Sequence, residues 1–166
     1  MSFYDNNPMH QRAFLRNGSA VLFNVLGTDI NPVIFGWTVP PGFLFHLKEV
    51  DLVITSTGNI SMVERFMNMG GPLTHGLLFR TVIDGVTNIA VNLKTNFDLL
   101  NQMNATFDLK VIGQQNVIVG NVVLQRPIVF DGDNFDKLDM CVQDDLTSLG
   151  YSAVSIVGTL ELKPQM

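Results

Sequence analysis

The chain has 166 residues, of which 46% are hydrophobic and only 15% are charged, and its formal net charge at pH 7 is −5. This length suits one domain, with a core that needs no disulfide or metal. The basic residues are scattered from Arg12 to Lys163, which argues against binding to nucleic acid. No segment has the length of a membrane span or the pattern of a signal peptide, so we expect no membrane association and synthesis in a reducing cytoplasm.

Uncharged polar residues take the place of the missing charges, because Asn, Thr, Gly and Gln are abundant. A surface of this kind costs less to desolvate than one rich in Lys and Glu, which favours extensive contact with partner subunits. The alternative is an uncharged β-sheet surface that faces solvent, and composition leaves both open.

The first residues have no clear hydrophobic period, and we predict an N-terminal arm at residues 1–18 ahead of a single domain at residues 19–166. The arm holds apolar residues with little means of local burial, namely Phe3, Tyr4, Phe14 and Leu15. Exposed apolar side chains often mark an interaction site, and an extended segment can pair with the edge of a neighbour's sheet. We therefore predict that these four residues contact a partner, the alternative being a terminus without a role.

From Ser19 onward, short apolar runs are separated by Gly, Pro, Asn and Asp. Ala20–Leu26 and Val33–Val39 predict two strands, and Phe43–Thr55 predicts a longer one. The alternation of that third run shifts by one residue near Lys48-Glu49, which predicts a β-bulge. Ile60–Met69 is the best candidate for a short helix, with a surface loop as the alternative.

Two hairpins follow in the chain. Leu77–Ile83 and Val86–Leu93 flank Asp84-Gly85, a pair that favours a type I′ turn. A second hairpin is expected from Phe107–Ile112 and Asn116–Leu124, and later strands from Pro127–Phe130, Lys137–Gln143 and Ser152–Leu162. Nine or ten short strands without long helical periods predict an all-β fold, specifically a two-sheet antiparallel jelly-roll sandwich.

Chemical motifs are sparse, and we assign no catalytic, cofactor-binding or metal-binding residue. Cys141 lies in an alternating run and is expected to be a buried small hydrophobe. His46 and Glu49 lie in a stretch similar to the first metal motif of cupins, but Leu44 and Lys48 occupy the positions where a second His would stand. A small cupin-like enzyme therefore remains an alternative. A glycosidase needs only two carboxylates in space, and such a pair also stays open.

An acidic turn formed by Asp131, Asp133, Asn134 and Asp136 has the oxygen ligands that calcium prefers. Its spacing is not that of an EF-hand, because Val142 stands where the bidentate Glu would be. We expect a solvated turn, with calcium binding as the alternative.

Three stretches carry a resemblance to a known family: Leu93–Leu100, Asp144–Tyr151 and Ser155–Leu162. In these stretches the chain resembles the jelly-roll decoration (cement) proteins of tailed bacteriophage heads. The resemblance implies a homotrimer that binds the major capsid protein on the outer capsid surface and stabilises the head, without catalytic residues. A phage fibre or carbohydrate-binding jelly roll is the alternative, and an exposed row of aromatic side chains on one sheet would favour it.

Overall fold

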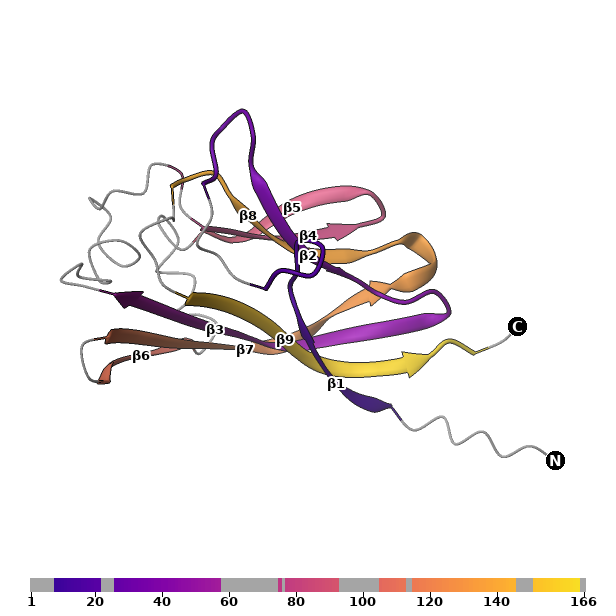
Figure 1. The fold of residues 1–166 in the computed structure, drawn as a ribbon. Coiled ribbons are helices and arrows are strands. Elements are labelled where there is room, and N and C mark those ends of the chain that lie inside the picture. Colours follow the sequence, from indigo (N-terminus) through magenta and orange to yellow (C-terminus); the bar gives the residue numbers. More distant parts are fainter. Residues whose placement is uncertain are drawn as a thin grey trace.

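The computed structural model describes residues 8–21, 26–57, 75, 77–92, 105–112, 115–145 and 151–164. Within these residues, two antiparallel sheets pack face to face, so the predicted all-β sandwich is confirmed (Figure 1). One sheet has five strands in the order β1-β9-β3-β7-β6, and the other has four in the order β2-β8-β4-β5. The strands are β1 (Met9–Phe14), β2 (Val33–Thr38), β3 (Phe43–Thr57), β4 (Leu77–Ile83), β5 (Val86–Asn92), β6 (Ala105–Ile112), β7 (Gln115–Asp131), β8 (Lys137–Val142) and β9 (Tyr151–Leu162).

Within each sheet, early strands of the chain pair with late ones, and β4 and β5 form a hairpin. β1 pairs with β9, β2 with β8, β3 with β7, and β4 with β5, all antiparallel. The chain passes between the two sheets from β1 to β2, from β2 to β3 and from β3 to β4. This order is compatible with the predicted jelly-roll winding.

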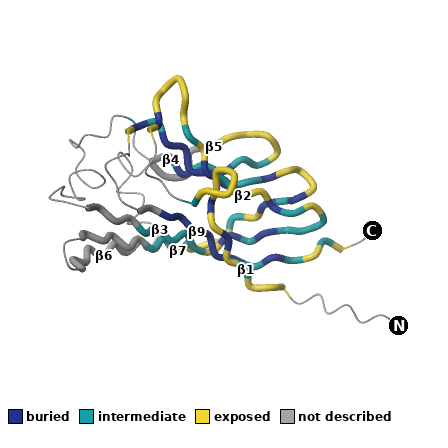
Figure 2. The backbone as a smooth tube through the Cα atoms, in the orientation of Figure 1, coloured by how far each residue is buried: buried dark blue, intermediate teal, exposed yellow. Residues whose placement is uncertain are grey.

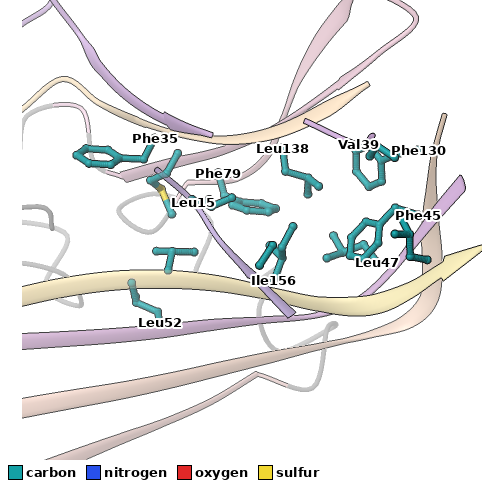
Figure 3. Close-up of a cluster of buried hydrophobic side chains, with 14 of the residues drawn as sticks. Leu15, Phe35, Val39, Phe45, Leu47, Leu52, Phe79, Phe130, Leu138 and Ile156 are labelled. Carbon is teal, nitrogen blue, oxygen red and sulfur yellow. The ribbon is translucent and has the colours of Figure 1, made fainter. Parts of the chain in front are cut away.

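The core lies between the two sheets and is built from the inward side of each strand's alternation (Figure 3). Phe45 and Leu47 of β3 and Ile156 of β9 are fully buried, and they face Phe35 and Leu138 of the other sheet. Burying a side chain of this size contributes about 1.5–3 kcal/mol. The buried segments run along the middle of the strands, whereas most exposed segments are turns and connections (Figure 2).

The β-bulge predicted near Lys48-Glu49 is confirmed, because the register of β3 shifts between Leu47 and Glu49 against both of its neighbours. Gly158 lies opposite the bulge on β9, where an added Cβ would collide with the carbonyl oxygen of His46. The bulge thus lets the two strands approach so closely that only glycine fits.

The predicted hairpin around Asp84-Gly85 is also confirmed. β4 and β5 pair up to Ile83 and Val86, and Asp84 and Gly85 have φ angles of 51° and 75°. Two consecutive positive φ angles are what a type I′ turn requires.

The prediction of a separate strand at Pro127–Phe130 is wrong. These residues belong to β7, which runs unbroken from Gln115 to Asp131. Opposite β3, the pairing passes from Val123 with Glu49 directly to Ile128 with Leu47, so residues 124–127 interrupt the register with β3. Pro127 has no N–H to donate, and a proline at such an irregularity does not end the strand.

The expected lack of burial in the N-terminal arm is wrong for Leu15, whereas Phe14 is exposed. β1 pairs with β9 along its whole length, and Ala13 and Leu15 lie in the core. Burial of these two side chains anchors the segment to its own domain. Residues 1–7, the helix expected at residues 60–69 and most of the strand expected at residues 20–26 lie outside the described residues.

Candidate functional site

The outer face of the five-stranded sheet carries a network of polar side chains from four adjacent strands. Arg12 of β1 donates hydrogen bonds to Asp51 Oδ2 at 2.8 Å and to Ser155 Oγ at 3.1 Å. Asn121 of β7 donates to Asp51 Oδ1 at 2.8 Å and to Glu49 Oε1. The network therefore links β1, β9, β3 and β7, and sequence analysis did not identify it as a unit.

Glu49 and Asp51 form the carboxylate pair that sequence analysis left open. The pKa of Glu49 is raised, first because its carboxyl shares a hydrogen bond with Asp51, then by burial and by repulsion from the Asp51 charge. Asn121 and Arg12 act in the opposite direction. Both Asp51 oxygens already accept hydrogen bonds from Asn121 and Arg12. Through these hydrogen bonds the two carboxylates link β3 to β1 and β7.

His46 lies on the same outer face, because its neighbours Phe45 and Leu47 point into the core. Its Nε2 lies 3.2 Å from Glu161 Oε2, whereas Glu49 is occupied by Asn121. In the part of the chain that the structure describes, no group of three or more His, Cys, Asp or Glu side chains could hold a metal ion. A cupin site needs its ligands to converge between the sheets, so this placement gives the cupin alternative no support.

The acidic turn between β7 and β8 is saturated by donors from the chain itself. Lys163 Nζ lies 2.8 Å from Asp131 Oδ2 and 2.7 Å from Asp133 Oδ2. Asp133 Oδ1 accepts a hydrogen bond from the Gly42 backbone N–H at 2.7 Å. These contacts lower the pKa of both carboxyls, the lysine hydrogen bond being the largest cause. An ammonium group thus stands between the oxygens that calcium would need.

Asp136 is the buried centre of the same turn. Only 2% of this residue is exposed, and its two carboxylate oxygens accept the backbone N–H groups of Asp131 at 2.8 Å and Asp84 at 2.9 Å. The carboxylate therefore holds the β7–β8 turn against the β4–β5 turn. We call the cluster of Asp131, Asp133, Asp136 and Lys163 the turn cluster.

The four predicted interaction residues differ in their exposure and in whether the structure describes them. Phe3 and Tyr4 lie outside the described residues. Phe14 is 40% exposed on β1, at the edge of the five-stranded sheet, whereas Leu15 is fully buried. Leu15 cannot contact a partner without opening the core, and its assignment as an interaction residue is corrected.

The four-stranded sheet has a buried ion pair on its outer face that sequence analysis also missed. Arg80 Nε lies 2.6 Å from Asp139 Oδ1, and the Asp139 side chain is 1% exposed. Cys141, two residues along β8, is buried as predicted, and burial raises the pKa of its thiol. A raised pKa leaves the thiol protonated and unreactive at neutral pH.

The one tryptophan packs inward. Trp37 contacts Phe45 edge to face, with 4.8 Å between the ring centroids, and lies against the core. It is therefore not part of an exposed aromatic row of the kind that binds sugars.

Comparisons with protein-family models, with curated proteins and with solved structures found no match to this chain. Among the described residues, no helix is both long enough and apolar enough to cross a membrane.

Proposed function

We propose that the chain is a non-enzymatic structural protein of a virion, a decoration protein that binds the major capsid protein on the outer surface of a tailed-phage head as a homotrimer. The sandwich, the low fraction of charged residues and the resemblance in three stretches support this proposal. The proposal invokes no cofactor.

The observation that carries the proposal is the position of β1. This strand forms one edge of the five-stranded sheet, and it exposes Met9 and Phe14 by 54% and 40%. Among the described strands none pairs with the outer side of β1, and an unpaired edge with apolar side chains invites pairing with another chain. Phe3 and Tyr4 precede it in the sequence and would extend the same contact.

The test removes residues 1–7, because a longer deletion would also remove β1 and the core residues Ala13 and Leu15. We expect the intact chain to be a trimer by light scattering and to sediment with phage particles through a density gradient. The truncated chain should keep its thermal unfolding midpoint and bind the particles more weakly. An intact chain that is monomeric and absent from the particles would contradict the proposal.

A further inference from the structure

Phe135 is an exposed aromatic residue in a backbone conformation that does not suit it. Its φ and ψ are 58° and 30°, in the left-handed region, and 73% of the residue is exposed. A bulky side chain with positive φ is rare, because Cβ crowds the backbone, and glycine or asparagine is favoured there. Phenylalanine thus costs stability at this position through its backbone, and its exposed ring gains no burial that would offset this cost. Strain of this kind is typical of functional sites.

The backbone around Phe135 is held rigidly. Phe135 N–H donates to the Gly132 carbonyl at 3.1 Å, and the next residue, Asp136, is the buried centre of the turn cluster. Asn134 Nδ2 donates to Asp84 Oδ1 at 2.7 Å, which joins the turn to the β4–β5 turn. A side chain on such a support loses little freedom on binding, which favours affinity.

Other exposed apolar residues lie at the same end of the sandwich. Val86 follows the β4–β5 turn and is 59% exposed, and Leu162 at the end of β9 is 43% exposed. Leu162 pairs with Phe43, next to Leu44, which pairs with Asp131 of the turn cluster. Figure 2 shows this end as a set of exposed turns from both sheets. Phe135, Val86 and Leu162 therefore lie at the same end of the sandwich.

The surroundings of this surface are acidic. Three carboxylates, those of Asp84, Asp131 and Asp133, outnumber the two lysines of the same turns and strand ends, Lys137 and Lys163. Asp84 and Asp133 are exposed beside the turn that carries Phe135. Two copies of this end would bring like charges together, which disfavours self-association here. A partner surface rich in Lys or Arg would complement these carboxylates.

We infer that Phe135, together with Val86 of the adjoining β4–β5 hairpin, anchors a second protein-binding surface. Its partner is a capsid subunit that presents an apolar pocket ringed by Lys or Arg. The inference rests on the proposed function, since it names the surface and the partner chemistry of the same attachment. Buried aromatic anchors of this kind dominate the energetics of protein interfaces.

The experiment compares the intact chain with Phe135→Gly and with a matched control, Ile30→Gly, by co-sedimentation with capsid particles assembled without this chain. Ile30 is 88% exposed on the loop before β2. We expect Phe135→Gly to weaken binding by at least about 30-fold. Its thermal unfolding midpoint should be equal or higher, because glycine relieves the strain. Ile30→Gly should bind like the intact chain. Raising NaCl from about 50 to about 500 mM should weaken binding of the intact chain.

Three outcomes would overturn the inference, and they differ from one another. If the intact chain binds and Phe135→Gly binds equally well, the surface is wrong while the proposed function stands. If the intact chain does not bind the particles, both fail. If neutral phosphatidylcholine vesicles bind the intact chain and not Phe135→Gly, the occupant is a lipid surface and not a protein.

Discussion

The turn cluster and the network on the outer sheet face use the same residue type, the carboxylate, with opposite results. In the turn cluster, Lys163 lowers the pKa of Asp131 and Asp133. On the sheet face, the pKa of Glu49 is raised by its hydrogen bond to Asp51. What differs is the nearest partner, a cation in one place and a second carboxyl in the other. In the turn cluster the carboxylates are stabilised in their charged form by Lys163. On the sheet face the charged form of Glu49 is disfavoured by Asp51 and is stabilised only by Asn121 and Arg12.

Burial sharpens this comparison. Asp136 is buried and accepts two backbone N–H groups, whereas Arg12 of the sheet-face network has a side chain that is 51% exposed. Exposed ion pairs contribute little because water and salt screen them. Backbone donors left unsatisfied by loss of a buried acceptor are far more costly. We therefore expect the turn cluster to dominate stability.

The largest effect is expected from Asp136→Ala. This change removes both acceptors and leaves the Asp84 and Asp131 N–H groups without their partner. The free energy of unfolding, measured by urea titration, should fall by about 3 kcal/mol. The matched control is Asp29→Ala, at a side chain that is 62% exposed, where a change below about 1 kcal/mol is expected. Equal effects at the two positions would contradict the assignment of Asp136 as a buried acceptor that holds two turns together.

A smaller effect, visible in its pH dependence, is expected from Lys163→Met. The folded-state pKa values of Asp131 and Asp133 lie below the ordinary value of 3.8, so their stabilisation is present above that pH and is lost as pH falls through the folded values. Lys163→Met should therefore flatten the loss of stability below about pH 4, measured as urea midpoints between about pH 5 and 2. An unchanged acid slope would contradict the assignment. Lys48→Met, at an exposed lysine of β3, controls for the loss of charge.

The smallest effect, of opposite sign, is expected from Glu49→Gln. The folded-state pKa of Glu49 lies above its ordinary value of 4.5, so its contribution is most favourable below that pH and is lost as pH rises through the folded value. Removing the charge should leave stability at pH 7 unchanged or slightly higher. The stability gained by the intact chain on acidification from about pH 7 to 5 should shrink in the variant. A clear loss of stability at pH 7 would show that ionised Glu49 is needed.

Local sequence determined the elements whose signals span a few residues. The bulge near Lys48-Glu49 and the Asp84-Gly85 hairpin were predictable, because side-chain alternation and positive φ preferences act within one strand or turn. The same local reasoning failed at Pro127, since strand continuity there depends on pairing with β3. It failed at Leu15 because nothing local reveals that β9 lies alongside β1.

Only the tertiary structure decided which polar residues meet. Asp84 and Asp136 are 52 residues apart, and Arg12 and Asp51 are 39 apart, so their contacts depend on how the two halves of the chain pair. The acidic turn could be predicted from the sequence, whereas its ion pairs with Lys163 could not. That lysine follows β9, and only the pairing of the strands brings it next to the turn. The sequence likewise gives no sign that Phe135 differs from other apolar residues. Its positive φ and its exposure are visible only in the folded structure. Sequence specifies periods and turns locally, and the pairing of distant strands determines which side chains become neighbours.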